Sequence, residues 1–289
     1  MRAAYPEVEG VVERDGVKLS YQVFGRGDRT ILLLPTWTII HSRFWKMQVP
    51  YLSRHYRVVT YDGPGNGGSD RVTDPDRYTF DAYAQDAVEV LDACGIERVV
   101  TVGLSLGAGY AARLARNAPD RVTGIVMVGP SLPLTPSSPE REATFQKFTA
   151  PYPEDVDGWG KYNLAYWYDD YQDFTRFFFE QCFNEPHSTK PIEDAVGWAA
   201  DTGPEVLEAE ASRPEPSEPW TEALESLSCP VLVIHGTRDQ ISPYERGVEA
   251  ARLTRGTLMT MTGSGHIPNT RDPVRVNLAI RRFVESVAS

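Results

Sequence analysis

The sequence has few of the residues that define several large protein classes. Its three cysteines, Cys94, Cys182 and Cys229, are odd in number and far apart, so neither a disulfide framework nor a zinc site is predicted. We expect buried, reduced thiols instead. The chain also lacks an apolar segment near its start and any hydrophobic run of membrane-spanning length. The expectation is a cytoplasmic protein without a membrane partner.

Positive charge is scarce as well. Lysine and arginine total 29 against 40 acidic residues, which gives a net charge of −11, and no basic cluster occurs. This argues against nucleic acid as a partner. Apolar residues, in contrast, make up 41% of the 289 residues. That is enough for the core of one large domain, or of a domain with an inserted cap.

Apolar runs typical of strands alternate with stretches typical of helices at both ends of the chain. Asp15-Gly16 between two such runs predicts a hairpin. The alternation predicts an α/β fold with a mostly parallel central sheet flanked by helices. The expected strands are 8–13, 17–24, 30–34, 57–61, 99–102, 122–128, 230–235 and 257–261, and the expected helices are 43–54 (ending or kinking at Pro50), 80–94, 108–116, 243–253 and 273–287.

The alternation stops between about residues 131 and 227. Four prolines interrupt 130–139, aromatic residues at helical spacing fill 158–183, and 201–222 is acidic and proline-rich, typical of a solvated connection. We therefore expect a helical cap of residues 131–227, inserted after the sixth strand into a core of residues 1–130 and 228–289. Most cap aromatics would simply pack the cap helices, and some would line an apolar pocket. The candidates for that lining are Trp159, Trp167 and Phe178.

One stretch carries the strongest chemical signal. Gly103-Leu104-Ser105-Leu106-Gly107 stands between a β-branched run and a stretch of helix formers. A strand, Gly-x-Ser-x-Gly and a helix form the context of a nucleophile elbow. Glycine at both flanks removes side chains that would collide across the tight turn. Ser105 is the predicted nucleophile, in preference to an idle serine in a glycine-rich turn.

A serine hydroxyl needs an adjacent base that is itself held by an acid. His266 follows the last predicted strand in a glycine-rich loop, whereas His41, His55, His187 and His235 have less suitable contexts. Asp239 follows the preceding predicted strand, and the loop after 122–128 offers no carboxylate. The order Ser, Asp, His along the chain also fits the template. Asp239 and His266 are therefore the predicted acid and base.

The loop Gly63–Gly68 matches the G-x-G-x-x-G pattern of dinucleotide-binding sites. Such a site needs a helix that opens directly after the glycines, so that its amides meet the pyrophosphate. The residues that follow, Ser69–Pro75, are typical of a loop. We interpret the pattern as a structural turn and expect no cofactor and no metal.

Taken together, these motifs resemble the α/β-hydrolase fold, in its capped serine-esterase form, over nearly the whole chain. The resemblance rests on the elbow, on His235–Asp239, on Gly263–His266 and on the Asp62–Asp70 loop. It implies that Ser105 attacks, that His266 is base and then acid, and that Asp239 orients His266.

The resemblance also implies an oxyanion hole built from the amide of Leu106 and an amide of the loop after Leu34. Many relatives have His-Gly in that loop, where this chain has Pro35-Thr36-Trp37. Proline has no N–H group, so the second donor would be Thr36 or, by register, Trp37. Trp37 is also a candidate to cover the substrate pocket.

The leading hypothesis is a cofactor-independent serine hydrolase that cleaves an ester, thioester or lactone with an apolar part through an acyl-enzyme. Acyl transfer, carbon–carbon bond hydrolysis and perhydrolysis use the same serine arrangement and stay open. A small-molecule binding protein or receptor with an idle triad is the non-enzymatic alternative.

Overall fold

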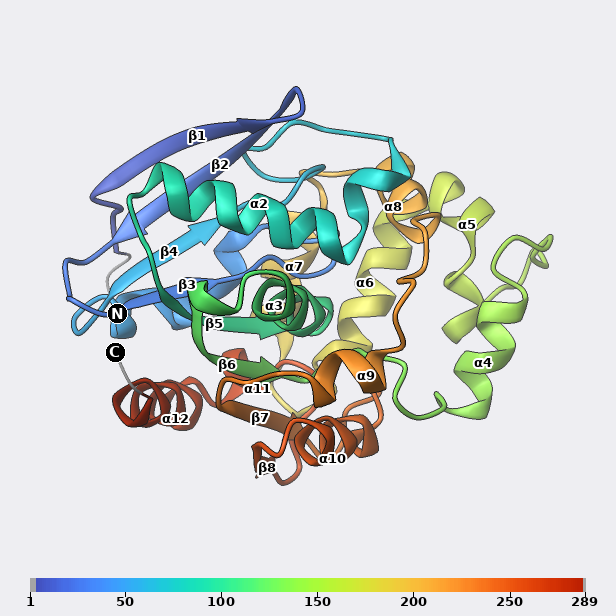
Figure 1. The fold of residues 1–289 in the computed structure, drawn as a ribbon. Helices are drawn as coiled ribbons and strands as arrows, with labels where there is room; N and C mark the ends of the chain where they lie inside the picture. The colour runs from blue at the N-terminus through green and yellow to red at the C-terminus, as the bar shows by residue number, and fades with distance from the viewer. Residues whose placement is uncertain (1–3, 288–289) are drawn as a thin grey trace.

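A computed structural model describes residues 4–287 of the chain, which form an eight-stranded sheet in the order β1-β2-β4-β3-β5-β6-β7-β8 (Figure 1). The first two strands pair antiparallel to each other and β2 pairs antiparallel to β4, whereas all the other pairs are parallel. The predicted mostly parallel sheet is thus confirmed. The strands are β1 Val8–Arg14, β2 Val17–Phe24, β3 Thr30–Leu33, β4 Arg57–Tyr61, β5 Val99–Leu104, β6 Val122–Val128, β7 Val231–Gly236 and β8 Thr257–Met261.

Helices cover both faces of the sheet because its central strands are apolar on both sides. In β5, Val99 belongs to one buried cluster and Val100 to the other. The first cluster includes side chains of α2 Phe80–Ala93, α3 Leu106–Asn117 and α10 Tyr244–Leu253. The second includes side chains of α1 Val49–Leu52 and α12 Pro273–Ser286. Three 3-10 turns, η1 Ser42–Met47, η2 Pro75–Tyr78 and η3 Pro119–Arg121, and the short helix α11 Pro268–Arg271 complete this part.

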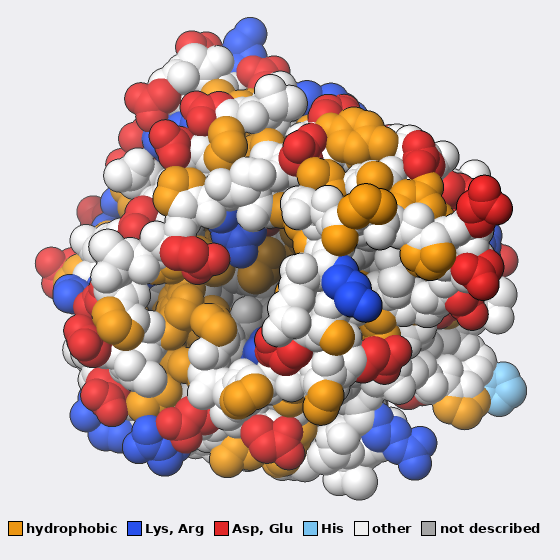
Figure 2. Space-filling model, turned by 90° about the vertical axis from the view of Figure 1, so that its right-hand side faces the viewer, with side chains coloured by type: hydrophobic (Ala, Val, Ile, Leu, Met, Phe, Trp, Pro, Cys, Tyr) orange, Lys and Arg blue, Asp and Glu red, His pale blue; other side chains and the backbone are white. Residues whose placement is uncertain are grey.

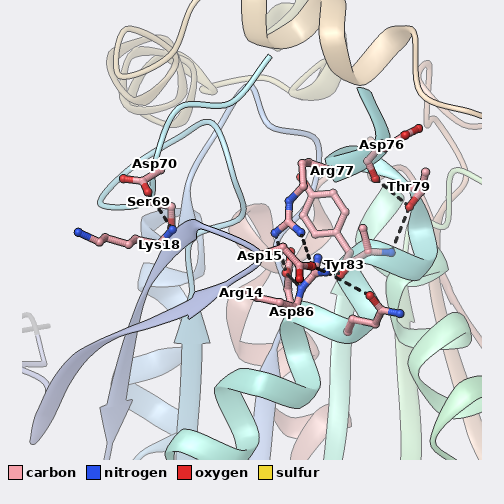
Figure 3. A network of polar contacts seen from close by, with 12 residues as sticks. Arg14, Asp15, Lys18, Ser69, Asp70, Asp76, Arg77, Thr79, Tyr83 and Asp86 are labelled. Carbon is pink, nitrogen blue, oxygen red and sulfur yellow. Dashed lines mark hydrogen bonds and ion pairs between the residues drawn. The ribbon is translucent and has the colours of Figure 1, made fainter. Parts of the chain in front are cut away.

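The β1–β2 hairpin turns at Asp15-Gly16, where both residues have positive φ (51° and 79°), as the sequence predicts. An ion-pair network holds it to α2 (Figure 3). Arg14 Nε lies 2.6 Å from the fully buried Asp86 Oδ1, which Arg77 also approaches at 3.3 Å. This network fixes the outer edge of the sheet.

The segment between β6 and β7 contains a series of helices that lie beyond the carboxyl ends of the parallel strands (Figure 1). The face they form is hollowed, with hydrophobic and charged side chains around the hollow (Figure 2). The last of these helices contacts α3 and α10 of the core. The division at residues 131 and 227 stays a prediction. The elements are α4 Pro139–Gln146, the 3-10 turn η4 Gly158–Lys161, α5 Leu164–Asp169, α6 Tyr171–Cys182, α7 Thr189–Ala199, α8 Pro204–Ala211 and α9 Trp220–Glu225.

Three local expectations need correction. Residues 43–54 form η1 and α1, which meet at Gln48, and Pro50 lies in the first turn of α1 rather than at a break. Proline suits that place because its missing N–H would be unpaired there anyway. Segment 201–222 is not a solvated connection, because it contains α8 with the fully buried Glu210. Of the cysteines only Cys182 is buried, while Cys94 and Cys229 are half-buried.

None of the helices within residues 4–287 has the length and apolar content needed to cross a membrane.

Candidate active site

Ser105 stands at the turn between β5 and α3, as the elbow motif predicts. Its backbone has φ 57° and ψ −117°, a strained region for a residue with a side chain. A side chain at Gly103 would overlap the Gly107 carbonyl, and one at Gly107 would overlap the Pro35 carbonyl. Both glycines are therefore required for the strand, turn and helix to approach this closely. The serine itself is 8% exposed.

Asp239 and His266 are brought together by the loops that follow β7 and β8. His266 Nδ1 lies 2.7 Å from Asp239 Oδ2. The other carboxylate oxygen, Oδ1, accepts hydrogen bonds from the backbone amides of Ile241 and Ser242, both at 2.8 Å. Both side chains are buried. This is the geometry in which a carboxylate fixes the orientation of an imidazole.

His235 is a second histidine that contacts the Asp239 carboxylate. Its Nε2 lies 3.0 Å from Asp239 Oδ2 and 3.1 Å from the Ser242 carbonyl oxygen. Because both neighbours are acceptors, Nε2 carries the proton and donates it. Sequence reasoning rejected His235 as the base and did not link it to Asp239. The sequence signal for this contact was that His235 and Asp239 are four residues apart, at the end of a strand and in the loop that follows it.

The two histidines decide the charge of Asp239. Burial by itself would raise the pKa of this carboxyl, but His266 and His235 outweigh burial and hold the pKa well below its usual range. Asp239 is therefore an anion at neutral pH.

The backbone at the end of β6 contacts both Ser105 and His266. The Ser105 amide donates to the Val128 carbonyl (2.9 Å), and the next residue, Gly129, has φ 49°. A side chain on Gly129 would lie 3.2 Å from His266 Nδ1, so the imidazole rests directly on this backbone. Among the hydrogen bonds of residues 4–287, none joins the Ser105 hydroxyl to His266. In unliganded enzymes such bonds are often long and tighten only with substrate.

The predicted oxyanion donors belong to two segments: Leu106 begins α3 directly after Ser105, and Trp37 follows β3. In the described part of the chain, neither the Leu106 nor the Trp37 amide has a hydrogen-bond partner. The residues around Trp37 are held firmly, since Thr36 Oγ1 donates to the Leu104 carbonyl at 2.9 Å. Thr38 N–H donates to Glu210 Oε2 at 3.0 Å. The described chain thus leaves one amide free directly after Ser105 and another on a loop tied to Leu104, and their use as an oxyanion hole stays a prediction.

Glu210 on α8 is a functional candidate that sequence reasoning missed. Besides Thr38, it accepts a hydrogen bond from the Tyr110 hydroxyl at 3.2 Å. The Tyr110 ring stacks on Tyr83 with centroids 3.9 Å apart, and Tyr83 OH lies 3.2 Å from Thr38 Oγ1. Burial raises the pKa of Glu210, and the guanidinium of Arg213 only partly opposes this. The network joins α8, the elbow helix and the Trp37 loop.

The glycine-rich loop that resembles a nucleotide site also supports the Trp37 loop. Asn66 Nδ2 donates to the Thr38 carbonyl at 2.6 Å, and Ser69 Oγ donates to the Asp62 carbonyl at 2.7 Å. On its other side the loop contacts β2, where Lys18 N–H donates to Asp70 at 2.8 Å (Figure 3). Irregular chain follows it up to η2.

The predicted pocket aromatics occupy different environments. Trp37 is half-buried, and its ring centre lies 4.8 Å from that of Phe178 and 6.0 Å from that of Trp167. Trp167 is fully buried, so it packs between its neighbours. Trp159 lines a cavity of about 740 Å³ together with Asp239. Their role in binding substrate stays a prediction.

Within residues 4–287 no three histidine, cysteine or acidic side chains are grouped so that they could hold a metal ion.

Comparison with known proteins identifies the family. The family model described as "alpha/beta hydrolase fold" matches residues 29–273. The chain belongs to the α/β-hydrolase fold family. This α/β-hydrolase is 30% identical to a non-heme haloperoxidase of Rhodococcus erythropolis, over 96% of this chain and 99% of the relative. It is 26% identical to a bifunctional esterase/perhydrolase of Acinetobacter calcoaceticus, again over 96% and 99%.

Its fold also matches solved structures. The crystal structure of the esterase RhEst1 from Rhodococcus sp. ECU1013 superposes with a TM-score of 0.78 at 24% identity, and the match covers 97% of this chain and 99% of that one. The relatives together support an α/β-hydrolase enzyme of the esterase type.

Proposed function

We propose that this α/β-hydrolase is a cofactor-independent serine hydrolase of small carboxylic esters, thioesters or lactones, with Ser105, His266 and Asp239 as its catalytic triad. The observation that carries the proposal is the hydrogen bond between His266 and an anionic Asp239. The backbone that receives the Ser105 amide at the end of β6 also contacts His266. The named esterase among the relatives supports the substrate class. Nucleic acid and membranes are not proposed as partners, and the cytoplasmic location stays a prediction.

In the first half-reaction His266 Nε2 accepts the proton of Ser105 as the serine oxygen bonds to the substrate carbonyl carbon. Asp239 holds the proton on Nδ1, which leaves Nε2 free as the base, and then stabilises the imidazolium. The amides of Leu106 and Trp37 donate to the oxyanion. The tetrahedral intermediate collapses, and the leaving alcohol, thiol or lactone hydroxyl takes the proton from His266.

In the second half-reaction water attacks the acyl-enzyme, and His266 removes its proton. Collapse of the second intermediate releases the acid and returns the proton to Ser105. The segment 131–227 covers the site as a cap in this proposal. Trp37, Trp159 and Phe178 supply the apolar walls of the pocket, and the fully buried Trp167 packs against Trp37.

A serine-directed fluorophosphonate probe tests the proposal. Wild type is expected to be labelled and inactivated, and Ser105→Ala is expected to resist labelling. The matched control is Ser131→Ala, which removes a nearby hydroxyl that the mechanism does not use and leaves labelling intact. Absence of labelling in folded wild type, or equal labelling of Ser105→Ala, would contradict the proposal. Tight binding of a small molecule without turnover, unchanged in Ser105→Ala, would favour the receptor alternative.

Perhydrolysis is a second candidate because two relatives that align with 96% of this chain are named haloperoxidase and esterase/perhydrolase. Here hydrogen peroxide replaces water as the attacking group, and the acyl-enzyme releases a peracid. Peracid formation from an ester and peroxide, lost in Ser105→Ala, would support this activity. Acyl transfer is separated from hydrolysis by product analysis with added alcohol or amine acceptors.

A further inference from the structure

Arg141, on α4, is a buried cation without an ion-pair partner in the described chain. Only 7% of the residue is exposed, and its Nε is buried without a hydrogen-bond partner. No carboxylate of the described chain forms an ion pair with it. Its guanidinium carbon lies instead 4.7 Å from the Trp159 ring centre and 5.1 Å from that of Phe145. Burying a guanidinium without a counter-ion is costly, so an absent anion is the natural complement.

The groups around Arg141 are already engaged with other partners. Arg246, also buried, donates from Nε to the Thr135 carbonyl and from a terminal nitrogen to Ser137 Oγ, both at 2.9 Å. The nearby Glu142 carboxylate accepts from the Ser137 amide at 2.9 Å. Asp239 is committed to its two histidines. The positive charge of Arg141 is therefore left facing open space.

That space is the cavity of about 740 Å³, whose lining includes Arg141, Trp159, Phe177, Gln181 and Asp239. Glu140 and Glu245 also line it, but both are exposed to solvent. The cavity thus combines aromatic walls with one buried cation beside the acid of the proposed triad.

A row of packed rings lies between this cavity and Trp37. Trp159 and Tyr162 have ring centres 6.4 Å apart, and Tyr162 and Trp37 have centres 6.1 Å apart. Arg141 therefore reaches the Trp37 loop through two aromatic side chains on one side and lines the same cavity as Asp239 on the other.

We propose that Arg141 binds a carboxylate carried by the substrate, so that the hydrolase acts on esters or lactones with an anionic end. This inference rests on the proposed function for its reaction, while its binding step can be measured without turnover. The carboxylate binds the guanidinium through charge-assisted hydrogen bonds, and Trp159 packs against the adjoining carbon chain.

Paired substrates test the proposal. Half-esters of dicarboxylic acids carry the charge on the acyl side, esters of hydroxy acids carry it on the alcohol side, and each has a neutral methyl-capped counterpart of equal length. Wild type is expected to favour the charged member of one pair. Arg141→Met should lower kcat/KM for that charged ester about 100-fold and leave kcat/KM for the neutral ester little changed. Arg141→Lys should give a kcat/KM for the charged ester between those of wild type and Arg141→Met.

Arg275→Met, which removes an exposed arginine of α12, is the control and should behave as wild type. Equal loss for charged and neutral esters, or no loss for either, would overturn the proposal.

A second arm separates failure of this inference from failure of the proposed function. Calorimetry is expected to detect a saturated dicarboxylate binding to Ser105→Ala and not to the double variant Ser105→Ala/Arg141→Met. If wild type is labelled by the fluorophosphonate but both proteins bind the dicarboxylate equally, hydrolysis stands and the role of Arg141 is refuted. If labelling fails while binding still depends on Arg141, the anion site stands without the reaction.

Discussion

Two fully buried carboxylates hold parts of the proposed site, Asp239 through His266 and Glu210 through Thr38 and Tyr110, and they differ in what surrounds them. Asp239 faces two imidazoles, which lower its pKa in spite of burial. Glu210 faces an amide and a tyrosine hydroxyl, and burial raises its pKa although the Arg213 guanidinium opposes the rise. Burial is the same for both carboxylates, so the partners set the ionisation. Asp239 is therefore suited to stay charged beside the His266 imidazole. Glu210 is suited to hold the Thr38 backbone in place.

A third buried carboxylate, Asp86, shows that burial of an acid and a raised pKa also occur away from the proposed site. Asp86 lies at the far edge of the sheet between Arg14 and Arg77 (Figure 3). Burial raises its pKa even though Arg14 opposes the shift. It joins the hairpin to α2 and touches no part of the proposed site, so a buried acid is not by itself a sign of catalysis.

The largest effect is expected from Asp239→Asn. An amide cannot stabilise the imidazolium and favours the wrong tautomer of His266, so kcat for ester hydrolysis should fall about 10⁴-fold. Asp86→Asn is the matched control, since it neutralises an equally buried acid; it should lower thermal stability and leave kcat unchanged. Similar kcat values for the two folded variants would remove the distinction between the two acids.

A smaller effect is expected from Glu210→Ala. Without its acceptor, the Thr38 amide no longer fixes the peptide next to the Trp37 donor, and a displacement of about 1 Å can cost about 100-fold. The loss should appear in kcat with KM little changed, because the donor acts mainly on the transition state.

Glu210→Gln keeps an acceptor oxygen and should restore most of the rate. A change in KM alone, or equal losses in the alanine and glutamine variants, would argue against a positioning role.

The smallest effect concerns stability against pH. The folded pKa of Glu210 lies above its usual value of 4.5, so its contribution to stability is complete below that value and is lost as pH rises through the raised pKa. Asp239 behaves oppositely, since its contribution is present above 3.8 and is lost as pH falls toward the lowered pKa. Urea unfolding across pH should therefore show a smaller loss of unfolding free energy above pH 4.5 in Glu210→Gln than in wild type.

The exposed Glu222→Gln serves as control and should keep the wild-type profile. The same loss of unfolding free energy above pH 4.5 in Glu210→Gln and wild type would show that Glu210 does not titrate differently on folding.

The elbow and the core strands could be predicted because each depends on local rules. Gly103 and Gly107 flank Ser105 for steric reasons that the five residues contain, and β-branched runs mark the buried strands. The acid and base could be placed by chain order, because loops at the carboxyl ends of parallel strands converge.

Glu210 could not be found in the same way. Its segment is acidic and rich in proline, which is typical of solvated chain, and only the fold brings it to Thr38 and Tyr110. The neighbouring Val206 and Leu207 are buried on the same helix, and this apolar pattern was the one available hint. Arg141 was hidden likewise, since no local pattern shows that a guanidinium will be buried without an anion.

The segment between β6 and β7 contacts both sides of the proposed triad. The Cys182 backbone carbonyl accepts a hydrogen bond from the His266 amide at 3.2 Å, and the Glu185 carboxylate accepts one from the Gly265 amide at 2.7 Å. Glu210 holds the opposite loop. An engineer who exchanges this insert for that of a relative to change selectivity would thereby also replace the supports of the base and of the anion-stabilising amide. A successful graft must carry these three anchoring residues along with the new binding surface.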